Sequence, residues 1–298
     1  MGLSRAAVAW LMEEHKRRPI EGTVLTLGVQ NVFLTQPEFE ALANRMDVTL
    51  IPSPKETRTA LVDGTITADH VFRRLGADRV VATDLDDFEG CDFVFDLNAS
   101  EIPEAHRGMY ELVLDAGTME HVFHVPNGFA NLSAFVAPGG RIVHQSPSSN
   151  HIDHGFWMFS PTLFWDYYTA NGYDLPRFDL FRYRFSVDQH ARWVFAEYRP
   201  NSLSKQMFGG LGGGCFGISL VAEETDRVGV QVIPQQGMYA TAWANSAPPG
   251  LGSTVKPSPL RRHWKSLVGA FQNLFPEEWR VRWRAASRRF PLPVRQRF

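Results

Sequence analysis

The chain of 298 residues has little cysteine, no long apolar run and almost no net charge. Its two cysteines, Cys91 and Cys215, cannot form a disulfide framework, which favours a reducing compartment. No apolar run is long enough to span a membrane as a helix. Residues 1–18 contain a short apolar patch but no long uncharged core, so we expect no signal peptide. The low cysteine content and the lack of a predicted signal peptide or membrane-spanning helix together predict a cytoplasmic protein.

The net charge of −2 hides an uneven distribution. Leu260 to Phe298 carry ten Lys or Arg and two Glu, a net charge of +8, which leaves −10 on the rest. This basic segment could dock on the acidic body, with its Arg stems packed and its charged heads in water. It could instead make peripheral contact with the inner membrane surface. We favour the first interpretation, and we expect no nucleic-acid partner because no such binding motif is present.

Short apolar runs alternate with segments of helical periodicity from Thr23 to Gly172. The predicted strands are Thr23–Leu27, Arg79–Thr83, Asp92–Phe95, Glu111–Asp115 and Arg141–His144. The predicted helices are Leu3–Lys16, Glu38–Met46, Ala68–Leu75, Val125–Val136 and a segment between Ser160 and Gly172, with Ser4 and Thr67 as caps. This alternation predicts an α/β fold with a Rossmann-like, doubly wound, mostly parallel sheet.

The pattern changes after Tyr173. Phe178–Phe185 alternates like an antiparallel strand, residues 186–206 are expected to be partly helical, and Ile218–Ala222 and Gly229–Ile233 resemble closing strands. We assign residues 1–247 to one α/β domain with an insertion at about 174–217. We expect residues 248–259 to form a linker rich in Pro, Gly and Ser, and residues 260–298 to form a basic, amphipathic helical extension.

The most informative stretch is Tyr110–Pro147. It reads as a buried strand, a polar loop, a helix with Pro126 in its first turn, a Pro-Gly-Gly turn and a second strand. Parallel α/β sheets carry their chemistry at the carboxyl ends of the strands. Here those ends are Asp115–His121 and His144–Pro147, so functional residues are expected there.

Two motifs in this stretch resemble the class I S-adenosylmethionine-dependent methyltransferases. Thr118–Val122 matches that superfamily's Leu-Glu-His-Val loop, and Ala137–Arg141 matches its Lys-Pro-Gly-Gly turn. The continuation at Asn150–Gly155 and Phe159–Thr162 is similar to a bacterial subgroup. The resemblance implies seven strands with the last antiparallel, S-adenosyl-L-methionine as cofactor, and a hydroxyl of a small molecule or glycan as methyl acceptor.

The resemblance also implies roles for residues at successive strand ends. Asp84 would accept hydrogen bonds from both ribose hydroxyls of the cofactor, whereas its plain alternative is a solvated acid. Asp96 would meet the adenine amino group, with Leu97 beside it; the alternative is a turn-capping residue. The remaining cofactor-binding candidates line the loop after the fourth strand: Asp115, Gly117 and Glu120. Glu120 could instead cap the following helix.

The turn after the first strand departs from the superfamily's pattern of an acid followed by Gly-x-Gly-x-Gly. Thr26 replaces the acid, Gly28 is kept, and Gln30 and Val32 replace the other glycines. Glycines let the backbone approach a ligand closely. Two hypotheses follow: a methyltransferase that uses Gly28 with the other candidates, or a non-catalytic binding protein of the same fold that has lost the cofactor.

Five of the ten histidines lie between residues 121 and 154. A hydrogen-bonded loop role suits His124 and His151. A general base, which an oxygen nucleophile would need, suits His121, His144 or His154, and the catalytic candidates are His121 and His154. A metal site at His151, Asp153 and His154 is the least favoured interpretation, because its spacing matches no standard zinc signature and no cysteine supports it. We therefore assign no metal ligand.

Overall fold

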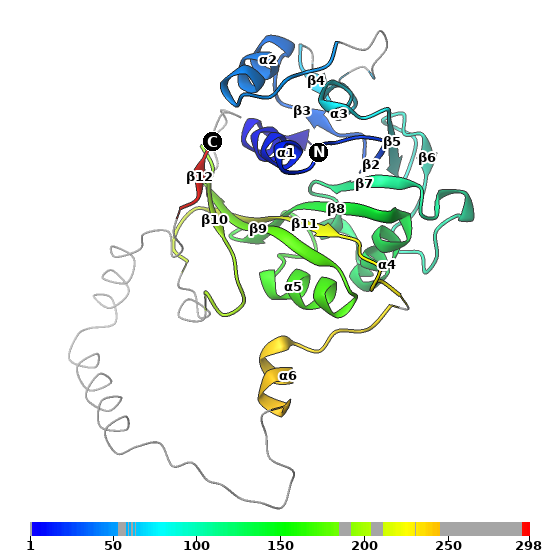
Figure 1. Ribbon diagram of the computed structural model, residues 1–298, viewed down its shortest axis with the longest axis vertical. Helices are drawn as coiled ribbons and strands as arrows, with labels where there is room; N and C mark the ends of the chain where they lie inside the picture. The colour runs from blue at the N-terminus through cyan, green and yellow to red at the C-terminus, as the bar shows by residue number, and fades with distance from the viewer. Residues whose placement is uncertain are drawn as a thin grey trace, which may run out of the picture. The chain divides into compact units, whose positions relative to one another are not determined.

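The first three helices begin at polar side chains that bond to the backbone of the first turn. The computed structural model describes residues 2–52, 58, 60, 62, 64–184, 192–203, 211–229, 231–244 and 294–298 (Figure 1). Ser4 accepts a hydrogen bond from the backbone N–H of Ala7 and caps α1 (Arg5–Arg17). Thr35 caps α2 (Gln36–Arg45), and Thr67 caps α3 (Ala68–Leu75). The predicted caps Ser4 and Thr67 are confirmed.

The main sheet contains nine strands among the described residues, in the order β12-β10-β9-β11-β8-β7-β2-β5-β6. Their bounds are β2 Thr23–Leu27, β5 Arg79–Asp84, β6 Phe93–Val94, β7 Tyr110–Asp115, β8 Val136–Ser149, β9 Asp174–Tyr183, β10 Val194–Glu197, β11 Cys215–Glu223 and β12 Gln296–Arg297. Strands β6, β5, β2, β7 and β8 are parallel, and β11 lies antiparallel between β8 and β9. The predicted Rossmann-like sheet with an antiparallel last strand is confirmed, and β10 and β12 extend its edge.

Helices cover both faces of this sheet (Figure 1). α1 and α3 lie on one face, and α4 (Val125–Phe135) and α5 (Pro161–Ala170) lie on the other. α1 is buried almost all round because it lies between the sheet and α2. Its Trp10 donates a hydrogen bond to Asp179 on β9 at 2.8 Å, and the Arg177 guanidinium lies 3.9 Å from the Trp10 ring centre. These contacts fasten the N-terminal helix to β9 of the main sheet.

A small second sheet lies beside the turn that follows β2. It joins β1 (Gly2–Leu3), β3 (Asn31–Val32) and β4 (Ile66–Thr67). The sequence does not predict these strands, because a strand of two residues forms only through pairing with distant segments. The chain therefore leaves β2 through a strand and enters a helix only at Gln36.

Residues 186–206 were predicted to be partly helical; the described residues 192–203 contain the strand β10 and no helix, and the others lie outside the described residues. The predicted strand Gly229–Ile233 is wrong. Residues 229 and 231–233 are in no strand, although their pattern alternates, because β8 and β9 already occupy both edges of β11. The element η1 (Glu104–His106) is a short 3₁₀ turn before β7.

The chain divides into two compact units. The larger comprises residues 1–200, 214–234 and 293–298; the smaller comprises residues 201–213 and 235–292 and contains α6 (Gly237–Ala244). The predicted linker at 248–259, and the basic extension as far as residue 293, lie outside the described residues. Within the described residues, no helix is long and apolar enough to cross a membrane.

Candidate functional site

Asp115 is the buried centre of the loop that follows β7. It lies opposite His144 in the register of β7 and β8, so the two side chains share one face of the sheet. The Asp115 carboxylate accepts hydrogen bonds from the backbone N–H groups of Thr118 and Met119 and from the Ser146 hydroxyl, and it bonds to His144 Nδ1 at 2.7 Å. Because the carboxylate is fully buried and saturated by protein donors, its role is to position this loop.

His144 connects Asp115 to α5. Its Nε2 lies 2.5 Å from the Tyr168 hydroxyl, so a neutral ring with the proton on Nδ1 satisfies both bonds. Burial raises the pKa of Tyr168 well above its ordinary value, which keeps that hydroxyl a donor. The sequence prediction treated His144 as a candidate base and missed Ser146 and Tyr168. Polar residues at alternate positions of β8 were the available signal for Ser146.

The backbone after Asp115 turns sharply into η2 (Met119–His121). Gly117 has φ of +87°, a conformation that favours glycine. The Thr118 hydroxyl then donates to the carbonyl oxygen of Leu27 at 2.9 Å, which ties this loop to the turn after β2. This hydrogen bond joins the carboxyl ends of the neighbouring strands β2 and β7.

Glu120 carries a buried carboxyl group with one side-chain hydrogen-bond partner among the described residues. Its side chain is 1% exposed, and its Oε1 lies 3.3 Å from His154 Nε2. Its other oxygen, Oε2, is buried without a hydrogen-bond partner among the described residues. Burial, reinforced by the negative charge of Asp115, raises the pKa of Glu120 to about 8. Glu120 is therefore mostly protonated at neutral pH, whereas an ordinary surface glutamate is ionised.

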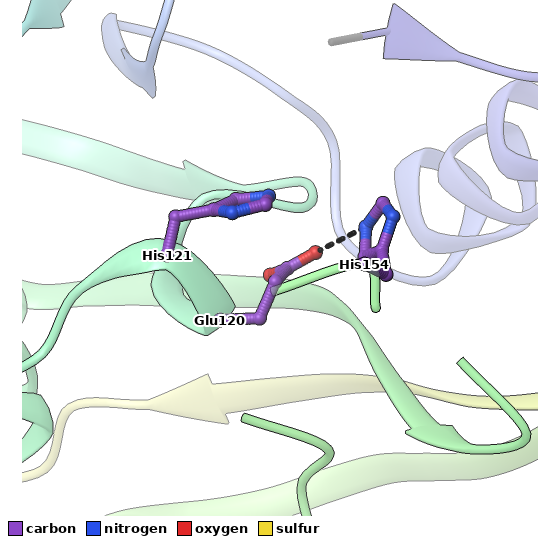
Figure 2. Close-up of side chains that lie close together, drawn as sticks. All are labelled: Glu120, His121 and His154. Carbon is purple, nitrogen blue, oxygen red and sulfur yellow. Dashed lines mark hydrogen bonds and ion pairs between the residues drawn. The ribbon is translucent and has the colours of Figure 1, made fainter. Parts of the chain in front are cut away.

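His121 and His154 lie beside this carboxyl group, with ring centres 5.3 Å apart (Figure 2). Figure 2 shows the three side chains converging, Glu120 and His121 from η2 and His154 from the loop after β8. Burial, with the neighbouring His154, lowers the pKa of His121. The two catalytic candidates are therefore side by side, although 33 positions separate them in the sequence.

Backbone contacts hold the His154 loop against η2. Trp157 donates its backbone N–H to the Glu120 carbonyl oxygen and its indole N–H to the Val122 carbonyl oxygen. A Cβ at Gly155 would lie 2.9 Å from the Glu120 carbonyl oxygen, so a larger residue would push this loop away. The glycine and the tryptophan together keep His154 within reach of Glu120.

The side chains of Thr26 and Gln30 support the turn after β2. Gly28 has φ of +83° and donates its N–H to the Thr83 carbonyl oxygen at 2.7 Å. The Thr26 hydroxyl bonds to the Gly28 carbonyl oxygen, and the Gln30 amide donates to the Leu27 carbonyl oxygen. Gly28 keeps the required backbone shape, while Thr26 and Gln30 are buried supports of the turn.

The two candidate acids of β5 and β6 stand at the carboxyl ends of those strands. Asp84 ends β5 and is half-buried; its Oδ1 accepts the N–H of Leu85. Asp96 is exposed, and its Oδ1 accepts both the backbone and the side-chain N–H of Asn98. Leu97 is buried, and its carbonyl oxygen accepts the Asn131 amide. Each acid uses one oxygen on its own turn.

The two loop histidines differ in their surroundings. His124 is exposed, and its backbone N–H donates to the Asn98 side chain. His151 packs edge-on against His154, with ring centres 5.8 Å apart, and burial lowers the pKa of His151. Exposed aromatic residues flank this region: Phe156 is 67% exposed and packs edge-on against Phe123 at 5.6 Å.

No known family model matches the chain, and no curated protein matches it by sequence. Its fold was also compared with solved structures. A 1,6-didemethyltoxoflavin-N1-methyltransferase from Burkholderia thailandensis, solved with 1,6-didemethyltoxoflavin and S-adenosylhomocysteine, is 15% identical with a TM-score of 0.35, over 74% of this chain and 77% of that one. A SAM-dependent methyltransferase from Archaeoglobus fulgidus is 12% identical with a TM-score of 0.40, over 74% and 95%. The YcgJ protein of Bacillus subtilis is 10% identical with a TM-score of 0.39, over 74% and 100%.

These three structures are similar to the chain at low identity. The fold assignment rests on the strand order of the main sheet, with β11 antiparallel between β8 and β9.

Proposed function

We propose that this protein is an S-adenosylmethionine-dependent methyltransferase that acts on a hydroxyl of a small molecule or glycan. One observation carries the proposal. The loops after β2 and β7 are joined through Thr118, and the second of them carries the buried Glu120 with His121 and His154. The turn after β2 and the cluster of Glu120, His121 and His154 are thereby held by one hydrogen-bonded loop.

The cofactor would lie across the carboxyl ends of β2, β5 and β6. Gly28 would bring its backbone close to the cofactor's amino-acid part, and Asp84 would accept hydrogen bonds from the ribose hydroxyls. Asp96 would bind the adenine amino group, with the apolar side chain of Leu97 beside the ring. The methyl group of S-adenosylmethionine is already activated by its sulfonium charge, so the protein mainly aligns and desolvates the reactants.

The acceptor would lie next to the histidines. A hydroxyl must lose its proton as it attacks, and a neutral imidazole can take that proton. The lowered pKa of His121 keeps its ring neutral near pH 7, and His154 lies within hydrogen-bonding distance of Glu120. The exposed rings of Phe156 and Trp157 would provide an apolar face for the acceptor.

Calorimetric titration with S-adenosylmethionine and S-adenosylhomocysteine tests the cofactor proposal. We expect wild-type protein to bind both, and Asp84→Asn to weaken binding at least tenfold because it removes a carboxylate from the ribose. The matched control is Asp87→Asn, an exposed acid three residues away that should leave the affinity unchanged. If the wild-type protein does not bind either compound at millimolar concentration, the cofactor role is excluded.

A second candidate is a non-catalytic binding protein of this fold. The turn after β2 favours it, since Thr26 and Gln30 fill positions at which the superfamily has an acid and a glycine. The same titration separates the two candidates: a protein that has lost the cofactor would show no heat with either compound, in the wild type or in Asp84→Asn.

A further inference from the structure

We infer that Glu120, His121 and His154 form a binding site for one divalent transition-metal ion of the zinc class. One ligand atom from each residue can be chosen so that all three lie within 4.8 Å of one another. No other group of three His, Cys, Asp or Glu side chains among the described residues meets this condition. The trio differs from the His151, Asp153 and His154 set that the sequence suggested.

The Glu120 carboxyl group supplies the second line of evidence. Its Oε2 is buried and has no hydrogen-bond partner in the described part of the chain, and no Lys or Arg there pairs with it. A buried carboxyl oxygen without a hydrogen-bond partner is costly, whereas a bound metal ion would satisfy it. Figure 2 shows the carboxyl group beside the two imidazoles, with one oxygen in contact with His154.

Two imidazole nitrogens and one carboxylate oxygen make a ligand set with a defined preference. Catalytic Zn²⁺ sites use three such protein ligands and keep a fourth position open, and the same set serves non-haem Fe²⁺. Mg²⁺ and Ca²⁺ prefer oxygen ligands and are disfavoured here. In the proposed methyltransferase, the open position would take the acceptor hydroxyl, and the ion would lower the pKa of that hydroxyl in place of a histidine base. The metal site itself does not depend on that function.

The three ligand atoms need to move only a short distance toward one another to bind one metal ion. Bond lengths of 2.0–2.2 Å in a tetrahedral site place ligand atoms about 3.4 Å apart. Glu120 Oε1 and His154 Nε2 are already 3.3 Å apart. His121 is exposed and the His154 side chain is half-exposed, so either ring can rotate toward the fixed carboxylate. The Trp157 contacts with Glu120 and Val122 keep the His154 loop in place during that adjustment.

The experiment uses the untagged full-length chain, stripped of metal with a chelator and dialysed, without S-adenosylmethionine. Zn²⁺ titration by calorimetry is expected to show one saturable site, and Co²⁺ to give visible absorption of a nitrogen- and oxygen-bound ion. A large excess of Mg²⁺ should not displace either ion. Because cofactor is absent throughout, failure of this inference is distinct from failure of the methyltransferase proposal.

Three variants locate the site. Glu120→Gln and His154→Asn should each weaken Zn²⁺ binding by more than about 100-fold, since they remove direct ligands. His124→Asn, an exposed histidine outside the trio, should bind like the wild type. Circular dichroism of the stripped proteins checks folding, and His154→Asn keeps the test valid if Glu120→Gln does not fold. Absence of a saturable site in the wild type, unchanged binding in a folded Glu120→Gln or His154→Asn, or equal loss in His124→Asn would overturn the inference.

Discussion

His70 on α3 is a buried histidine whose surroundings oppose its charging. It is 6% exposed, its ring packs edge-on against Phe39 at 6.1 Å, and its Nε2 has no hydrogen-bond partner among the described residues. Burial and the nearby Arg74 lower its pKa, while Asp69 and Glu40 partly oppose that effect. The folded chain therefore binds a proton at His70 less readily than the unfolded chain does, for which the pKa is about 6.5.

This difference predicts a pH-dependent loss of stability. With the folded pKa below the unfolded one, the contribution of His70 is intact above about pH 6.5 and is lost as the pH falls below that value. His70→Gln should therefore lose less unfolding free energy than the wild type between pH 7.5 and pH 5, as measured by urea denaturation. His124→Gln, at an exposed position, should retain the wild-type dependence. Equal pH dependence in wild type and His70→Gln would contradict the prediction.

At the scale of elements, β11 and β9 pack so closely that one position requires glycine. Gly217 on β11 lies opposite Phe181 on β9. A Cβ at residue 217 would lie 2.1 Å from the Phe181 ring, which itself stacks on Trp193 with ring centres 4.2 Å apart. The ring covers the bare backbone of the facing strand, and this contact joins β11 to the outer half of the sheet.

Gly217→Ala should therefore destabilise the protein by about 2 kcal/mol, the usual cost of overpacking a tight core. The clash is specific, so adding Phe181→Leu should recover part of the loss, and the double variant should be more stable than the sum of the single changes predicts. Urea unfolding measures all three variants. The control is Gly213→Ala, which meets no atom within 4 Å and should change the unfolding free energy by less than about 0.5 kcal/mol. Strict additivity of the two changes would show that the contact is not the cause.

At the scale of the molecule, the sequence predicted the elements whose signals are local. Ser4 and Thr67 cap their helices, and Thr23–Leu27 is β2 to the residue, because capping and apolar periodicity involve near neighbours in the chain. β1, β3 and β10 were missed because they depend on pairing with distant segments. Gly229–Ile233 has the alternation of a strand, but the preceding strand β11 is already paired with β8 and β9 on its two sides.

The candidate site also has a part that the sequence predicted and a part that only the structure shows. The sequence placed functional residues at the carboxyl ends of parallel strands, and the structure brings His121 and His154 together there. The sequence could not show that the Asp115 side chain bonds to Ser146 and His144, or that one oxygen of Glu120 has no hydrogen-bond partner among the described residues. Side-chain direction at a strand end depends on which donors the next strand presents, and that is a tertiary property.

Residues 294–298 close the far edge of the main sheet. β12 pairs antiparallel with β10, and Trp193 and Phe298 exchange two backbone hydrogen bonds of 3.1 Å. The Phe298 ring packs against buried Phe195 at 5.5 Å, and Arg295 lies 3.7 Å from Asp179, the partner of Trp10. This segment of the basic extension therefore packs on the α/β body, which agrees with the docking interpretation for these five residues.

Deleting residues 294–298 should destabilise the protein by about 2 kcal/mol, because it removes one buried aromatic contact and the strand bonds that shield β10. The free edge of β10 should also promote association between molecules, since an unpaired strand is a template for another chain. Urea unfolding and light scattering measure the two effects. Arg295→Gln, which removes only a half-exposed ion pair, should cost less than about 1 kcal/mol and leave the protein dispersed. If the shortened chain is as stable and as dispersed as the full chain, β12 is not a structural strand, and the basic extension must be explained by a partner outside the body.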